Sequence, residues 1–327
     1  MIPNVNAGTI SVRSINLSNG QTQLVSTPAV GTQPSMVRVH PSRNAFYVSN
    51  IGTSNISGVG INSDGSTFVL PGSPYAGPAG ARNVHVHPSG KFLYVAGNTQ
   101  MQSFQVNTDG SLTSLGTANM PTTPRNEGAF TPDGQFLHIP VFNGVMTFAI
   151  NTTTGLATAG TFTPIATAAP VNDVAISPDG VLLIANCQVA GANNDIIAPF
   201  TVGANGTLTA LPVNNLNYDV GLGHFASNGV YYVGDVTDAN ARLFGYTISP
   251  GGVLNQIFGS PFAAPGGGSQ TVVDPTGNFV FSAANGNSMA VNRRLNDNTL
   301  QAATGSPFTD NLTNPFIFDF YQVAVPQ

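Results

Sequence analysis

One short phrase, repeated along the whole chain, constrains the fold more than any other feature of this sequence. Its clearest copy is HPSGKFLYV at His87–Val95, where Pro-Ser-Gly precedes a run of aromatic and aliphatic residues. A tight turn that leads into a β-strand has this composition. The second residue of each copy serves as a marker for the repeat. The markers are Pro41, Pro88, Pro132, Pro178, Ala226 and Pro275, and the copy at Ala226 is degenerate. These markers are 47, 44, 46, 48 and 49 residues apart, a period typical of the blades of a propeller.

A second series of turns has nearly the same period. Each member places a pair such as Asn-Gly or Asp-Gly between two strand-like runs, which suits a hairpin turn. The members end at Gly20, Gly65, Gly110, Gly155, Gly206 and Gly252, and Asp297-Asn298 adds a seventh. The sequence therefore has seven hairpins but only six copies of the opening phrase.

The mismatch is resolved if the chain begins in the middle of a repeat. Residues Asn4–Ser26 resemble the later strands of a blade, and Phe316–Phe320 resembles a first strand. Pairing the two would complete a seventh blade and close the ring. We therefore predict an all-β, seven-bladed β-propeller with four-stranded antiparallel blades, closed by a C-terminal strand that joins the N-terminal strands. Residues 1–327 would form this single domain, with the closing blade built from about residues 1–26 and 315–327.

The composition limits the partners of such a domain. Charged residues make up 7% of the chain, against roughly 25% in ordinary soluble proteins. The net charge of −5 argues against nucleic acid as a partner, because nucleic acids require a basic surface. No apolar run reaches the roughly 20 residues of a membrane span. We expect a monomer in an extracellular or cell-surface setting, with a leader that this chain lacks; a cytoplasmic location is the alternative.

Several of the scarce charged residues precede the expected inner strands of the blades. Because strands alternate in direction, the starts of these inner strands lie on the same face as the long variable loops, where function usually resides. We therefore place the site at this loop-rich face, around the mouth of the central channel. The candidate catalytic residues are Arg82, Arg125, Glu127 and His224, and the candidate ligand-binding residues are Asn83, Asn126, Asn172, Asp173 and Gln270.

Two interpretations of these charged residues remain open. Arginine side chains suit carboxylate or phosphate groups, and a glutamate or histidine beside them could act as a general base on water. Alternatively, Arg125 and Glu127 form a structural pair that closes the channel.

The remaining histidines and the single Cys187 do not indicate a metal, a cofactor or a disulfide. His40 and His87 occupy a slot that also accepts Thr, Ser or Asp, which favours a structural hydrogen bond across the turn. A His-x-His pair such as His85 and His87 can chelate a metal, but the sequence places no carboxylate beside it. We therefore expect neither a metal site nor a cofactor.

The phrases HPSRNAFYVSN, HPSGKFLYVAGN and SPDGVLLIANC resemble the repeat of the lactonase-type seven-bladed propellers. That family includes propeller-type 6-phosphogluconolactonases, carboxy-muconate lactonising enzymes and secreted YVTN-repeat proteins. The resemblance implies Arg, His and Glu residues around the channel, and Arg82, Arg125, Glu127 and His224 match by position in the repeat. The low charge of this chain is closer to the secreted members than to an enzyme of sugar phosphates.

We carry two functions forward. The first is a secreted or surface-exposed binding protein that holds a small ligand, a glycan or a protein at the loop-rich face and the channel mouth. The alternative is a lactone hydrolase, or a related isomerase, that acts on a small sugar lactone or carboxy-lactone. In that case Arg82 and Arg125 would hold a carboxyl or carbonyl oxygen, and Glu127 or His224 would activate water.

Overall fold

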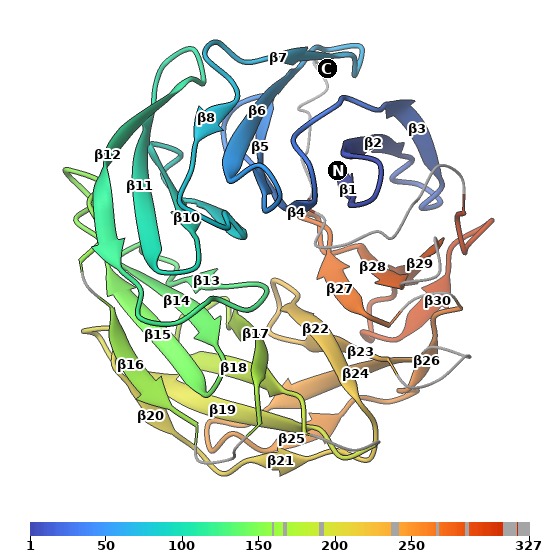
Figure 1. Ribbon diagram of the computed structural model, residues 1–327. Coiled ribbons are helices and arrows are strands. Elements are labelled where there is room, and N and C mark those ends of the chain that lie inside the picture. The colour runs from blue at the N-terminus through green and yellow to red at the C-terminus, as the bar shows by residue number, and fades with distance from the viewer. Residues whose placement is uncertain are drawn as a thin grey trace.

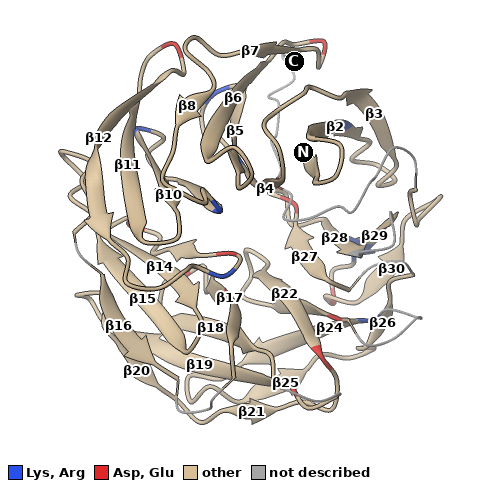
Figure 2. Ribbon diagram, in the orientation of Figure 1, with Lys and Arg blue, Asp and Glu red and all other residues tan. Residues whose placement is uncertain are grey.

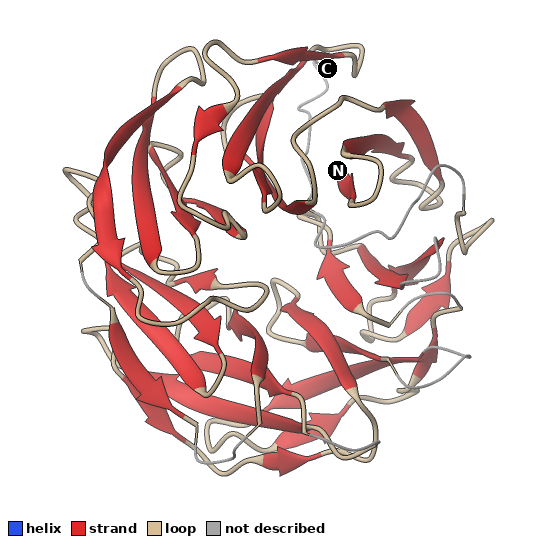
Figure 3. Cartoon of the chain, in the orientation of Figure 1, coloured by secondary structure: helices blue, strands red, loops and turns tan. Residues whose placement is uncertain are grey.

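The computed structural model describes residues 1–158, 160–165, 169–189, 193–236, 242–265, 268–284, 288–309 and 319. Every regular element in this part of the chain is a β-strand, and the strands form sheets arranged around a common centre (Figures 1 and 3). The all-β, propeller-type fold predicted from the repeat is therefore confirmed. No helix in these residues is long and apolar enough to cross a membrane.

The first three sheets follow the chain in order. The N-terminal sheet contains β1 (Ile2–Asn4), β2 (Thr9–Ile15) and β3 (Thr22–Ser26). The next contains β4 (Pro34–Val39), β5 (Ala45–Asn50), β6 (Asn55–Ile61) and β7 (Thr67–Val69), with β8 (Tyr75–Ala76) paired to β6. The third contains β9 (Asn83–Val86), β10 (Phe92–Ala96), β11 (Gln100–Val106) and β12 (Leu112–Asn119). Consecutive strands within each sheet are antiparallel, as the hairpin turns predict.

The same meander continues in the second half of the chain. One sheet contains β13 (Ala129–Phe130), β14 (Phe136–Val141), β15 (Gly144–Ala149) and β16 (Thr161–Pro164). Another contains β17 (Val171–Ile176), β18 (Leu182–Cys187), β19 (Ile196–Val202) and β20 (Leu208–Ala210), with β21 (Asn214–Asn215) paired to β19.

The last strands are joined across two repeats. One repeat contains β22 (Val220–Phe225), β23 (Tyr231–Asp235), β24 (Arg242–Ile248), β25 (Leu254–Gln256) and β26 (Phe262–Ala263). The other contains β27 (Gln270–Val273), β28 (Phe279–Ala284), β29 (Ser288–Arg294) and β30 (Leu300–Ala302). A single parallel pair, Leu222 with Gln270, connects them into one nine-stranded sheet.

The turn of the repeated phrase forms because its glycine adopts a left-handed backbone. Gly90 has a φ of 70°, and its N–H donates to the carbonyl of His87 at 2.8 Å. Side chains with a Cβ rarely adopt this conformation, which explains the glycine at the end of the turn. The Pro-Ser-Gly sequence thus reverses the chain between β9 and β10.

Neighbouring sheets pack face to face through large apolar side chains. Tyr47 on β5 and Leu93 on β10 are fully buried in one cluster, and Tyr94 on β10 and Leu137 on β14 belong to the next. Each strand therefore contributes alternate residues to the two interfaces that its sheet forms. Removal of this apolar surface from water is the main force that holds successive sheets together.

The histidines of the repeated phrase bond one sheet to the next. His40 Nε2 lies 2.8 Å from the carbonyl oxygen of Gly90, and His87 Nε2 lies 3.0 Å from that of Gly134. The other ring nitrogen of each accepts a local backbone N–H two residues later. The structural role predicted for His40 and His87 is confirmed, and it extends across the sheet interface.

The predicted closing strand, Phe316–Phe320, lies outside the described residues except for Asp319. Asp319 and Met1 are joined by backbone hydrogen bonds, including one of 3.2 Å from the Asp319 N–H to the Met1 carbonyl. The Asp319 carboxylate also accepts the backbone N–H of Val39 on β4 at 2.9 Å. Asp319 therefore contacts both Met1, which precedes β1, and the inner strand β4 of the next sheet.

Candidate functional site

The innermost strands of the sheets surround a central cavity of about 470 Å³. Its polar lining comes from four sheets and from the C-terminal part of the chain: Arg38, His85, Glu127, His224, Asp274 and Asp319. Figure 2 shows charged residues of both signs near the middle of the ring, in a chain with few charges elsewhere. Phe130 and Ile176 give the cavity apolar walls. The cavity thus combines apolar walls with a group of ionisable side chains, as small-molecule sites commonly do.

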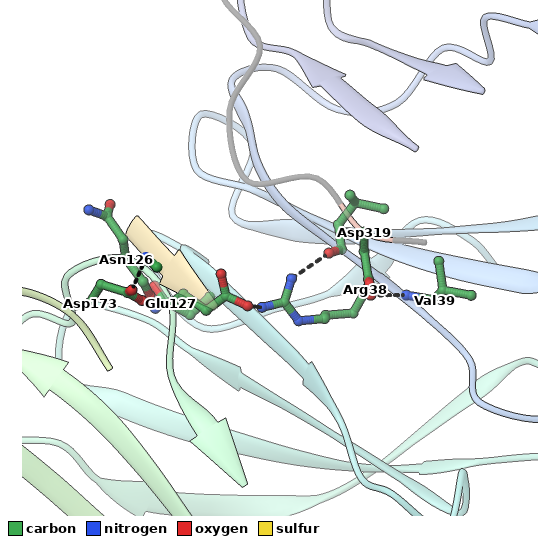
Figure 4. A network of polar contacts seen from close by, with 9 residues as sticks. Arg38, Val39, Asn126, Glu127, Asp173 and Asp319 are labelled. Carbon is green, nitrogen blue, oxygen red and sulfur yellow. Dashed lines mark hydrogen bonds and ion pairs between the residues drawn. The ribbon is translucent and has the colours of Figure 1, made fainter. Parts of the chain in front are cut away.

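An ion pair crosses this cavity. Arg38, on β4, donates from Nη2 to Oε1 of Glu127, which lies just before β13 (Figure 4). The two side chains are 14% and 17% exposed, so both charges are mostly removed from bulk water. Arg38 also donates from Nη1 to the carbonyl of Val37 at 3.0 Å, which fixes the direction of the guanidinium.

Arg38 was not among the residues predicted from the sequence. A usable signal was present, because Arg38 lies two residues before His40 just as His85 lies two residues before His87. Arg38 and His85 therefore hold the same position in successive copies of the repeat. Because residues two apart on a strand share a face, both are expected to point the same way, toward the centre of the ring.

Two neutral imidazoles share the cavity with this ion pair. Burial, with a smaller contribution from the positive charge of Arg38, holds the pKa of His85 well below its usual value. Burial also lowers the pKa of His224, although the negative charges of Glu127 and Asp319 partly oppose it. His224 is half-buried, whereas His85 is 3% exposed. Both rings are therefore neutral near pH 7, and His224 is the more accessible.

A fully buried polar network supports the strand that carries His224. Asp173 Oδ2 accepts the N–H of Gly223 at 2.9 Å, and Asn186 Nδ2 lies 3.4 Å from the same oxygen. Asn186 in turn bonds the hydroxyl of Tyr231 at 2.7 Å. Burial and the nearby charge of Glu127 raise the pKa of Asp173 well above its usual value. Asp173 therefore positions Gly223, and with it the neighbouring His224.

The remaining predicted residues form a separate group at the starts of the inner strands. Asn126 donates from Nδ2 to Oδ1 of Asn172 at 2.8 Å, and Arg125 reaches the same oxygen at 3.5 Å. Asn83 donates to the carbonyl of Asn126. Arg82 lies close enough to Arg125 that the second positive charge adds to burial in lowering the Arg82 pKa. None of these residues lines the central cavity.

The predicted cluster is therefore divided between two places. Glu127 and His224 lie in the cavity, while Arg82, Arg125, Asn83, Asn126 and Asn172 bond one another or crowd together at the strand starts. Gln270 is buried at the start of β27, beside Leu222 of the neighbouring inner strand. The suggested structural pair of Arg125 with Glu127 is not formed, because Glu127 pairs with Arg38.

The sequence predicts a site at the loop-rich face, whereas the central cavity extends to the other end of the inner strands. The cavity extends to the short turns that follow the inner strands, and Pro178, Ser227 and Pro275 of these turns line it. At the opposite end, hydrogen bonds between Asn83, Asn126 and Asn172 link neighbouring sheets. The cavity therefore reaches the face with the short turns.

Within the described part of the chain, no three His, Cys, Asp or Glu side chains come together in a group that could hold a metal ion. Cys187 is buried, and burial raises the pKa of its thiol to about 12, which makes it a poor nucleophile.

Comparison with known proteins assigns the family. Residues 3–216 match the family described as Lactonase, 7-bladed beta-propeller, which covers more than half of the chain. The chain belongs to the lactonase family of seven-bladed β-propellers. The resemblance noted in the repeated phrases is confirmed. No curated protein matches the sequence.

Solved structures show the same fold as this lactonase-family chain at low sequence identity. A periplasmic gluconolactonase from Pseudomonas aeruginosa is 17% identical, with 97% of this chain and 95% of that chain covered and a TM-score of 0.76. A candidate 6-phosphogluconolactonase from Bacteroides uniformis is 16% identical, with 95% of each chain covered and a TM-score of 0.77. A Staphylococcus aureus virginiamycin B lyase is more distant, at 13% identity, 82% and 83% coverage and a TM-score of 0.55. At these identities the likeness shows the fold alone.

Proposed function

We propose that this protein hydrolyses the lactone of a small, uncharged sugar in the central cavity. The observation that carries the proposal is the Arg38–Glu127 ion pair beside the neutral His224 in one cavity. The family assignment and the gluconolactonase neighbour support the same reaction class. They favour the hydrolase, which was the alternative in the sequence analysis, over a secreted binding protein. The extracellular location stays a prediction.

Hydrolysis of a lactone requires a nucleophilic water and a group that stabilises the developing oxyanion. In the proposed reaction His224 removes a proton from water as the water attacks the carbonyl carbon. The Arg38 guanidinium stabilises negative charge on the carbonyl oxygen. The bond from the carbonyl carbon to the ring oxygen then breaks, and the protonated His224 returns the proton to that oxygen. The product is the open-chain hydroxy acid.

The other residues orient these two groups. Glu127 holds the Arg38 guanidinium through the ion pair, and Asp173 holds the backbone next to His224. This assignment differs from the sequence prediction, because Arg38 has the role of holding the carbonyl oxygen that was expected for Arg82 and Arg125. His85 lines the same cavity but is only 3% exposed, so it forms part of the cavity wall.

The charges of the cavity favour an uncharged substrate. Arg38 is the one cation among its described lining residues, and Glu127, Asp274 and Asp319 are acidic. A phosphorylated lactone would add roughly two more negative charges to the cavity. We therefore propose a sugar lactone without a phosphate group.

We also propose the closed, seven-bladed form of the ring. The backbone hydrogen bonds between Asp319 and Met1 support it, because they join the two ends of the chain at the first strand. Counting β22–β26 and β27–β30 as separate blades, despite the single parallel pair between them, supports the number seven.

A pH-stat assay tests the proposed reaction. Purified protein is given δ-gluconolactone and a panel of other uncharged sugar lactones, and spontaneous hydrolysis is subtracted. We expect His224→Asn and Arg38→Met each to lower kcat/KM by roughly 10²-fold or more, the usual loss for a general base or an oxyanion donor. Arg293→Met, which removes an exposed arginine, is the matched control and should leave the rate unchanged. Turnover no faster than the spontaneous reaction, across the panel, would reject the proposal.

A further inference from the structure

Asp319 connects the end of the chain with the central cavity. Its backbone bonds Met1, from which it is separated by 318 positions in sequence. Its side-chain Oδ2 accepts the N–H of Val39, the residue that follows Arg38, at 2.9 Å. Figure 4 shows this contact at the Arg38 end of the network, with Glu127 reaching the guanidinium of Arg38 from the other side of the cavity. The contact anchors a carboxylate beside the cation of the cavity.

The hydrogen bond also holds the Asp319 carboxylate on the wall of the cavity. Val39 belongs to the inner strand β4, and the neighbouring N–H of His40 is the one that points outward, to the carbonyl of Ala45 at the start of β5. Alternate N–H groups of a strand point to opposite sides, so the Val39 N–H points toward the centre of the ring. Asp319 therefore lines the cavity.

The electrostatic effect of Asp319 already reaches the rest of the cavity. Although burial dominates and lowers the pKa of His224, the negative charges of Glu127 and then Asp319 oppose that effect. Charges interact strongly where water is scarce, and the interaction decreases with distance rather than stopping at direct contact. An anionic ligand group near Arg38 would meet the same two negative charges.

We infer that Asp319 is a specificity-determining residue, which together with Glu127 offsets the charge of Arg38 and keeps anionic lactones out of the cavity. Arg38 then acts on the carbonyl oxygen of an uncharged ring and does not capture a carboxylate or phosphate group. The identity of the excluded substrates rests on the proposed function, whereas the exclusion of anions is a property of the cavity alone.

Inorganic phosphate is the probe that tests this inference without turnover. Its binding to the full chain is measured by isothermal titration calorimetry in the native protein, in Asp319→Asn and in Asp64→Asn. Asn keeps an oxygen that can accept the Val39 N–H, so the first substitution removes charge with little change of shape. Asp64 lies in an exposed turn and does not line the cavity, so its substitution makes the same change in net charge outside it.

We expect Asp319→Asn to bind phosphate at least about tenfold more tightly than the native protein, because one repelling charge beside the site is gone. Asp64→Asn should bind like the native protein. Equal phosphate affinity in all three would overturn the inference and leave Asp319 with a structural role only. If Asp319→Asn does not fold, Glu127→Gln removes the other carboxylate and should strengthen phosphate binding in the same direction. Absence of lactone turnover would reject the proposed function and would not change this result.

Discussion

The Arg38–Glu127 ion pair offers the sharpest test of the site. It predicts both a loss of unfolding free energy when either residue is replaced and a coupling energy between the two substitutions. We consider the substitutions Arg38→Met and Glu127→Gln, singly and together. Each single substitution removes the attraction between Arg38 and Glu127 while the remaining charged side chain stays mostly buried. The double substitution removes both charges and retains side chains of similar length.

The expected magnitude follows from the burial of the two side chains. Removal of one partner from a buried pair costs about 3–5 kcal/mol, and an exposed pair contributes about 0–1 kcal/mol. Exposures of 14% and 17% place this pair near the buried limit, although neither side chain is fully buried. We therefore expect each single substitution to lower the free energy of unfolding by about 2–3 kcal/mol. The double variant should lose less than the sum, with a coupling of about 1.5–2 kcal/mol.

Urea unfolding of the four proteins, followed by fluorescence and circular dichroism, measures these values. The two probes must report the same transition for each protein, because the cycle is meaningful only for two-state unfolding. Arg293→Met serves again as the control for loss of an arginine, with an expected change within about 0.5 kcal/mol. Single-variant losses that simply add in the double variant would refute the ion pair as an energetic unit.

Three further predictions concern other residues. Arg82→Gln and Arg125→Gln should keep kcat/KM within about threefold of the native value, because both arginines lie outside the cavity; a loss as large as that of Arg38→Met would contradict this. As the pH decreases, kcat/KM should fall with an apparent pKa below 6.5, since burial lowers the pKa of His224 and only its neutral form accepts a proton; a pH-independent rate would exclude it as the base. Burial lowers the pKa of His138 from 6.5 to about 4, so between these values the unfolded chain binds a proton that the native protein does not. The free energy of unfolding should therefore fall as the pH drops through this window, and His138→Gln should weaken that dependence.

Much of the fold could be predicted because its signals are local. A turn such as His87–Gly90 depends on a few adjacent residues and on one glycine with positive φ. The interval between such turns is set by four short strands and their hairpins, so the period indicates the blade. The same local logic explains why the structural role of His40 and His87 was predicted from one repeated slot.

The membership of the cavity could be predicted only in part. Glu127 and His224 are of scarce residue types and lie near inner strands, but the same reasoning also selects Arg82 and Arg125, which lie outside the cavity. Arg82 and Arg125 lie only two or three residues before His85 and Glu127, which line the cavity. A shift of a few residues along a strand is enough to move a side chain from the cavity to the start of the strand. Spacing along the sequence does not show how far each inner strand is shifted, along the axis of the ring, relative to the inner strands of neighbouring sheets.

An all-β chain of repeated antiparallel sheets follows from local sequence signals alone, because turn chemistry and alternation act over a few residues. Which charges meet depends on the assembled fold. Arg38, Glu127, His224 and Asp319 belong to separate parts of the chain, and their contacts depend on the packing of inner strands from several sheets around one centre. The physical reason is that electrostatic interactions depend on distance and burial in space, and both are set by the assembled ring.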